Sequence, residues 1–199
     1  MTVEYLSGNR IRGLNSEKSL LSNVVSGSVY ISKDTNKSFV FEGVSSFDFS
    51  TSTAGGVSNQ PTDATESGQY ISGNTHYGKQ VQSATFHMAR VGNPSGTMVY
   101  KIRRADDNGV IATSVGIPAE YLSTAITAVT LNFNDEILPN MAIRVTVSGV
   151  TGSSGNVANL RGGGSDVVSG QSLTSWNGSA WTQYGNDCAG KLNFGWRQL

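Results

Sequence analysis

The feature that most constrains this chain is the alternation of apolar and polar residues between short runs of turn-forming residues. Residues 86–114, FHMARVGNPSGTMVYKIRRADDNGVIATS, show three such runs separated by GNPSG and DDNG. Alternation places the apolar side chains of a strand on one face of a sheet, and Asn108–Gly109 suits the positive φ of a tight turn. The segment therefore predicts three consecutive β-strands.

Similar alternating runs continue from Tyr70 to the end of the chain, for example at 129–133, 143–148 and 192–196. Because each run has one apolar face, two sheets that pack face to face would bury all of these faces. Turn residues recur about every 8–12 positions. The pattern predicts an all-β protein built on a jelly-roll-like β-sandwich.

The chain divides into three parts. Residues 1–45 hold a polar segment with scattered Leu and Ile, interpreted as an extended arm or a short helical turn, and then a β-hairpin of 28–32 with 38–42. Residues 46–69 are rich in Ser, Thr and Gly, and after one short strand they resemble a linker or a long surface loop. Residues 70–199 form the predicted sandwich domain.

Three local patterns inside the sandwich domain have their own predictions. SWNGSAW predicts a hairpin with Asn177–Gly178 in its turn. PAEYLSTA is a candidate helical turn because Pro118 suits the first turn of a helix. NVANLRGGGS, which begins at Asn156, contains a glycine run and is interpreted as a loop.

The charge balance argues against nucleic acid and membranes as partners. Lys and Arg total 14, as do Asp and Glu, so the formal net charge is zero. Proteins that bind nucleic acids or anionic membranes normally carry a basic excess. The pair Arg103–Arg104 is a local exception, interpreted as a solvated strand edge. No stretch approaches the roughly 18 apolar residues of a membrane span.

The cysteine content and the N-terminus suggest where the chain works. The single Cys188 allows no intrachain disulfide, so stability must come from the core or from partner subunits. MTVEYLSGNRIRG lacks the apolar core of a signal peptide, although Gly-, Ser-, Thr- and Asn-rich β-chains are common outside cells. One resolution of the conflict is a virion protein, which would assemble in the host cytoplasm and be extracellular after release.

No motif in the sequence predicts catalysis or a bound cofactor. His76 and His87 lie in different segments without a metal-ligand spacing, and Cys188 has no base beside it in the sequence. No Gly-x-Ser-x-Gly elbow occurs between a strand and a helix. The adjacent acids Asp106–Asp107 and Asp135–Glu136 sit in turns and not as a spaced glycosidase pair. We expect a protein that is not an enzyme.

Two kinds of ligand stay open. Jelly-roll loops often bind calcium through oxygen atoms, and the candidate ligands in DDNG and GNDC are Asp106, Asp107 and Asp187. The other ligand is a glycan, because exposed Trp and Tyr rings stack on sugars. The alternative for these rings is that they close one end of the sandwich core. The candidate glycan residues are Trp176, Trp181 and Tyr184, which cluster near the C-terminus with Trp196.

The first 27 residues carry apolar side chains without a steady period. We therefore expect them to pack on a different subunit or virion protein, because a few buried Leu or Ile anchors, each worth roughly 1.5–3 kcal/mol, hold subunits together. The residues of this expected assembly arm are Leu6, Ile11, Leu14, Leu20 and Leu21.

Three stretches carry a resemblance to a known group of modules: QSATFHMARVGNPSGTMVYKIRRADDNG, VTLNFNDEILPNMAIRVTVSG and AWTQYGNDCAGKLNFG. They resemble the sandwiches called choice-of-anchor domains and related jelly-roll modules of phage and archaeal-virus structural proteins. The hairpin YISKDTNKSFVFEGVSSF looks like one frequent in phage tail and head-surface proteins, with Phe39 and Phe47 where an aromatic residue and Trp are usual. The resemblance implies a structural or adhesive module and carries over no catalytic residues. No sorting signal follows Leu199, which favours incorporation into a particle over cell-wall attachment.

The leading hypothesis is a virion structural protein, a capsid, decoration or tail-surface subunit that binds copies of itself and other virion proteins. The alternative is a glycan-binding adhesion module that contacts cell-surface glycans. An enzyme is the third class, and it would be favoured by a pocket that holds His76 or His87 against a carboxylate and a Ser.

Overall fold

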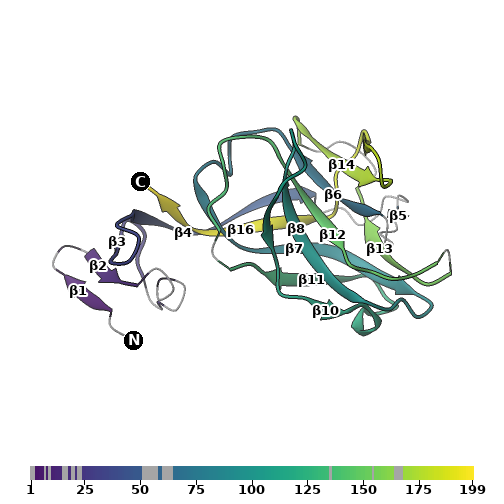
Figure 1. The fold of residues 1–199 in the computed structure, drawn as a ribbon, viewed down its shortest axis with the longest axis horizontal. Helices are drawn as coiled ribbons and strands as arrows, with labels where there is room; N and C mark the ends of the chain where they lie inside the picture. The colour runs from purple at the N-terminus through teal and green to yellow at the C-terminus, as the bar shows by residue number, and fades with distance from the viewer. Residues whose placement is uncertain are drawn as a thin grey trace.

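The computed structural model confirms the all-β prediction: two sheets pack face to face as a β-sandwich (Figure 1). The structure describes residues 3–6, 8, 10–14, 18, 21, 24–50, 58–59, 65–134, 136–153, 155–163 and 168–199. Within these residues no helix is long and apolar enough to cross a membrane.

The larger sheet has nine strands among the described residues, and β11 pairs with β7 beside the main path. The main path is β1 (Glu4–Leu6), β2 (Arg10–Gly13), β3 (Val29–Ser32), β4 (Ser38–Ser50), β16 (Gly190–Gln198), β7 (Lys79–Val91), β13 (Val157–Arg161) and β5 (Ser58–Asn59), and β11 is Thr127–Asn132.

The smaller sheet has seven strands among the described residues, and β9 pairs with β8 beside the main path. The main path is β10 (Ile117–Pro118), β8 (Thr97–Arg104), β12 (Ile143–Ser148), β6 (Glu66–Ile71), β14 (Gln171–Trp176) and β15 (Trp181–Gln183), and β9 is Val110–Thr113. The expected helical turn near Pro118 is a short 3₁₀ turn, Ala119–Tyr121.

The core lies between the two sheets and follows from the alternation. Met98, Tyr100 and Ile102 of β8 are fully buried, and Phe86 of β7 meets the Tyr100 ring edge-on at 5.1 Å. The Tyr100 hydroxyl donates to the carbonyl oxygen of Val129 in the opposite sheet at 3.0 Å, so the one polar atom of this ring is satisfied. Burial raises the pKa of this phenol far above its ordinary value.

A smaller second core lies at the other end of the molecule. Strands β1, β2 and β3, with the start of β4 and the end of β16, form what we call the N-terminal β-unit, which projects from the sandwich and carries both chain termini (Figure 1). Its buried residues are Ile11, Tyr30, Phe39 and Trp196. The N-terminal segment is thus not a free arm, because β2 pairs in parallel with β3.

Two boundaries differ from the sequence-based expectation. The predicted hairpin is present as β3 and β4, but β4 continues through the expected boundary at residue 45 to Ser50, and Phe49 is fully buried in the main core. The loop expected after Asn156 is wrong for Val157–Arg161, which forms β13 along β7. Half of the expected connection, at 51–57 and 60–64, lies outside the described residues.

Candidate functional site on the outer face of the smaller sheet

The outer face of the smaller sheet carries a group of polar and aromatic side chains that the fold brings together from distant parts of the chain. Along β8, Tyr100 and Ile102 face the core, so Lys101 and Arg103 face outward. The strand pairing places Arg144 of β12 opposite Arg103. We call this surface the outer face, and it extends across β6 to β14 and β15.

Glu66 is the centre of an ionic cluster on the outer face. Arg103 donates to both of its carboxylate oxygens, at 2.8 and 2.7 Å, and Lys101 lies 3.2 Å away. The hydroxyl of Thr146 donates to the same carboxylate at 2.8 Å. Burial alone would raise the pKa of Glu66, but these hydrogen bonds and positive charges outweigh it and lower the pKa to about 2.

This cluster corrects the interpretation of Arg103–Arg104 as a solvated strand edge. The Arg103 side chain is only 15% exposed, and β8 is an inner strand of its sheet. Arg104 is 45% exposed and pairs with Asp107 in the following turn. The sequence could not show the difference, because the partner of Arg103 is Glu66, far away along the chain.

The two indole rings come from opposite positions of one hairpin. Trp176 of β14 pairs with Trp181 of β15, and their rings are 5.4 Å apart at a tilt of 43°. The predicted turn is confirmed: Gly178 has a positive φ of 96°, and the side chain of Asn177 accepts the backbone N–H of Ser179 and Ala180. Both rings are partly buried.

Trp181 reaches from the hairpin to strands on the far side of β6. Its Nε1–H donates to Oδ1 of Asn108, in the turn after β8, at 3.0 Å. The guanidinium of Arg144 lies 4.7 Å from the Trp181 ring centre and 5.5 Å from that of Tyr70, within cation–π distance of both. The Trp181 ring therefore connects β15 with β12 and with the turn after β8.

The outer face also holds polar atoms with unused hydrogen-bonding capacity. Arg144 donates through Nη1 to Ala105, yet its buried Nε has no partner among the described residues. The buried hydroxyl of Ser172 likewise has none. The outer face therefore groups two partly buried indole rings with the Arg144 guanidinium, and an exposed part of an indole ring is a surface on which the apolar face of a ligand can pack.

Tyr184 does not join the indole pair. Its hydroxyl shares a 2.9 Å hydrogen bond with Ser175, the residue before Trp176. Successive residues of a strand face opposite sides of the sheet, so Tyr184 lies away from the outer face. Trp196 is also separate, because it is buried in the N-terminal β-unit. The structure thus brings Trp176 and Trp181 together and adds Arg144, Tyr70 and Glu66, which sequence reasoning missed.

The three calcium candidates are not brought together. Asp187 is fully buried, where it accepts hydrogen bonds from Gln69 and from the backbone of Val168. Asp106 and Asp107 lie in the exposed turn after β8, and Asp107 accepts the backbone N–H of Gly109 at 2.9 Å. Within the described ranges, no three His, Cys, Asp or Glu residues form a group that could hold a metal ion.

His76 and Cys188 are both buried inside the protein. His76 is fully buried, its Nε2 lies 2.9 Å from the carbonyl oxygen of Met141, and burial lowers its pKa. Cys188 is fully buried, and burial raises the pKa of its thiol well above the ordinary value. A thiol that is not ionised and not accessible is a poor nucleophile.

The expected assembly residues have different environments. Ile11 is 4% exposed and packs in its own chain, which corrects its assignment to an interface. Leu21 is half-buried against the same cluster. Leu6 and Leu14 are 43% and 41% exposed and remain candidates. Leu20 lies outside the described residues.

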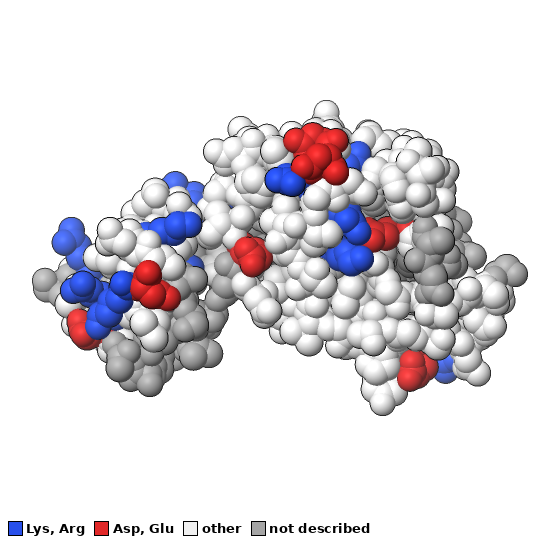
Figure 2. Space-filling view, viewed as in Figure 1, with Lys and Arg blue, Asp and Glu red and all other residues white. Residues whose placement is uncertain are grey.

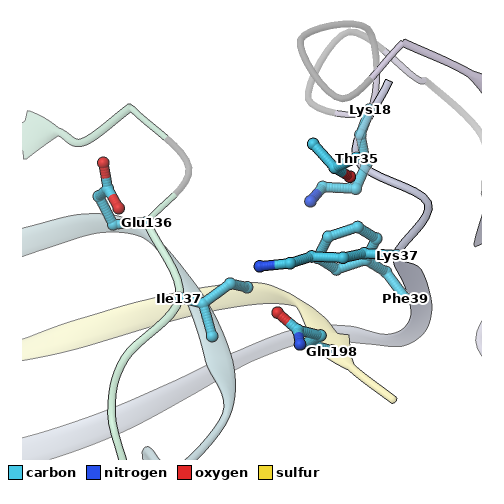
Figure 3. A pocket seen from close by; sticks show the side chains of 7 residues that line it. All are labelled: Lys18, Thr35, Lys37, Phe39, Glu136, Ile137 and Gln198. Carbon is cyan, nitrogen blue, oxygen red and sulfur yellow. The ribbon is translucent and has the colours of Figure 1, made fainter. Parts of the chain in front are cut away.

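A hollow of about 300 Å³ lies where the N-terminal β-unit meets the sandwich. The amino groups of Lys18 and Lys37 point into it toward Ile137, and the carboxylate of Glu136 points away (Figure 3). Lys18 is almost fully buried, with Nζ 3.4 Å from the centre of the Phe39 ring. The junction between the two parts is therefore partly open.

Comparison with protein-family models and with curated proteins finds no match.

Proposed function

We propose that this chain is a structural subunit at the surface of a virus particle, which assembles through its N-terminal β-unit and presents the sandwich. The observation that carries the proposal is the exposed outer strand of that unit. All three residues of β1 are exposed, and Tyr5 and Leu6 are 71% and 43% exposed. Two apolar side chains on an edge strand favour association.

Three other features support the assignment of assembly to the N-terminal β-unit and of surface presentation to the sandwich. In the described residues β1 pairs only with β2, so its other edge offers unpaired backbone groups to a second copy of this chain. The sandwich has its own complete core, separate from that of the N-terminal β-unit. Figure 2 shows charged side chains of both signs in small groups, with broad uncharged surface between them.

The substitution Tyr5→Lys tests assembly. We expect the natural chain to sediment as an oligomer and the variant as a monomer, because a charge on an edge strand opposes strand pairing. Tyr121→Lys is the matched control, since Tyr121 is 77% exposed but lies in the 3₁₀ turn of the sandwich. Equal sedimentation of the natural chain and Tyr5→Lys would contradict assembly through β1. Mass spectrometry of purified particles then tests whether the chain is a virion component.

Glycan binding is the second candidate function, favoured by the indole pair and Arg144 on the outer face. An aromatic surface beside a guanidinium suits a sugar ring. On a glycan array we expect binding by the natural chain and a loss of roughly tenfold in Trp181→Ala. Tyr121→Ala, which removes an exposed ring elsewhere, should bind normally. An array without hits would remove this candidate and leave the assembly proposal intact.

A further inference from the structure

A hollow of about 260 Å³ lies on the outward side of the larger sheet, across four neighbouring strands. Lys191 of β16 is opposite Asp48 of β4 on one side and Thr85 of β7 on the other. His87 of β7 is opposite Ala128 of β11. We call this the His87 hollow, and it is lined by Asp48, Ser50, Thr85, His87, Ala128, Gly190 and Lys191.

The hollow is open because two of its lining residues are small. A Cβ atom added at Gly190 would lie 2.2 Å from the carbonyl oxygen of Thr85, so the backbone excludes any side chain there. Ala128 contributes only a methyl group. A methyl group and a bare backbone give a low, partly apolar floor surrounded by polar side chains. The volume suits one small ring and not a longer chain of rings.

The two charges of the hollow are not neutralised by each other. Asp48 and Lys191 face each other across adjacent strands, yet in the described part of the chain neither makes an ion pair or a side-chain hydrogen bond. Opposite charges at paired positions normally attract. Here the carboxylate and the ammonium both remain available to a ligand.

His87 adds a third unused polar group. Its Nδ1 atom is shielded from solvent and has no hydrogen-bond partner among the described residues. Buried polar atoms without a partner are uncommon in folded proteins. Thr85 beside it shares a 2.8 Å hydrogen bond with the hydroxyl of Thr130, which fixes the wall of the hollow.

Catalysis is not the best interpretation of this set, although it joins a histidine, a carboxylate and a serine. A nucleophile must be hydrogen-bonded to its base, and the base to a third group that orients it. No hydrogen bond joins His87 to Asp48 or Ser50 in the described structure. These side chains line a common space and are not hydrogen-bonded to one another, as proton transfer between them would require. This arrangement favours a binding site.

We propose that the His87 hollow binds a single sugar residue that carries a carboxylate. The ammonium of Lys191 pairs with the ligand carboxylate, and Asp48 accepts hydrogen bonds from ring hydroxyls. The apolar face of the ring lies on Ala128 and Gly190, and a further hydroxyl contacts His87. This site belongs to the larger sheet and is independent of the indole surface on the smaller one.

The test is ligand-detected NMR on the full chain with D-glucuronate as probe and D-glucose as the uncharged analogue. We expect glucuronate to bind and glucose to bind at least about tenfold more weakly, because glucose lacks the charge-assisted bond. Lys191→Met should reduce glucuronate affinity about tenfold without changing glucose binding. Ala128→Leu, which fills the hollow, should abolish binding of both.

Two controls separate binding from folding and from nonspecific attraction. Lys37→Met makes the same substitution in the N-terminal β-unit and should leave glucuronate binding unchanged. Each variant should melt within a few degrees of the natural chain, since Lys37 and Ala128 are exposed and Lys191 is only partly buried. Absence of glucuronate binding by the natural chain, equal binding of both sugars, or equal loss in Lys37→Met would overturn the proposal. Preferential binding of glycine, a zwitterion, would replace the sugar with an amino acid and would also overturn it.

Discussion

Glu66 illustrates how a single residue organises the outer face. A carboxylate whose side chain is only 10% exposed is costly to bury unless it is paired and hydrogen-bonded. Arg103, Lys101 and Thr146 supply those partners from two neighbouring strands. The ion pair therefore offsets the cost of burying this carboxylate, and Arg103 also donates to the backbone of Asn108, whose side chain accepts the N–H of Trp181.

The lowered pKa of Glu66 predicts how stability depends on pH. The pKa of Glu66 is about 2 in the folded protein and 4.5 in the unfolded chain, so its interactions stabilise the protein fully above pH 4.5. That contribution, about 3 kcal/mol, is lost as the pH falls from 4.5 toward 2. Urea unfolding between these pH values measures it. Glu66→Gln should lose most of this dependence, and an unchanged pH dependence in the variant would contradict the assignment.

Gly68 of β6 lies close to the backbone of its neighbour β12, because glycine has no Cβ atom. A Cβ atom there would lie 1.9 Å from the carbonyl oxygen of Val145. We expect Gly68→Ala to destabilise the fold by at least about 2 kcal/mol, because backbone must move to admit the methyl group. Gly73→Ala is the control, since its nearest atom would be 3.9 Å away. Chemical denaturation of both variants measures the difference, and similar midpoints would show that β6 adjusts freely.

For the secondary-structure elements, the sequence predicted where the strands lie but not which strands pair with one another. Alternation is a local property, so β8, β12 and the β14–β15 hairpin are evident from their own residues. Pairing is not local: β6 lies between β12 and β14, which follow it by many residues. For this reason the indole pair was predictable from one hairpin, whereas its contacts with Arg144 and Asn108 were not.

The hydrogen bond from Trp181 to Asn108 stabilises the β14–β15 hairpin separately from the packing of its two indole rings. Trp181→Phe keeps an aromatic ring over Arg144 but removes the Nε1–H bond to Asn108. We expect a loss of about 1 kcal/mol in unfolding free energy. Trp176→Phe is the matched control, because no described hydrogen bond uses its indole N–H. Denaturant titration compares the two, and an equal cost would show that ring size and not the hydrogen bond matters.

At the scale of the whole molecule, two cores share two long strands. β4 and β16 run from the sandwich into the N-terminal β-unit, where Trp196 packs against Tyr30 and Phe41. The apolar residues of the first 27 positions lacked a period because, among those described, Leu6 lies in β1, Ile11 lies in β2, and Leu14, Leu21, Val24 and Val25 follow β2 outside any strand. Only the packed structure shows that Ile11 faces inward and Leu6 outward.

This division makes two truncations of the chain behave differently. Removing residues 1–8 deletes β1, whose side chains are all exposed, and keeps Ile11 in the second core. Removing residues 1–27 also deletes β2 and leaves Tyr30 and Trp196 without their cover. We expect both truncations to abolish assembly, since both lack the exposed edge. Only the longer one should lose protection from hydrogen exchange at 29–41 and 194–198.

The internal control is β12 in the sandwich core, where all six residues are buried. Its amides should exchange equally slowly in the natural chain and in both truncations, because the main core does not include the N-terminal β-unit. Fast exchange at β12 after the longer truncation would show that the two cores unfold together. Normal assembly after the shorter truncation would show that subunits meet elsewhere than at β1, and the exposed Leu14 would then be the next position to substitute.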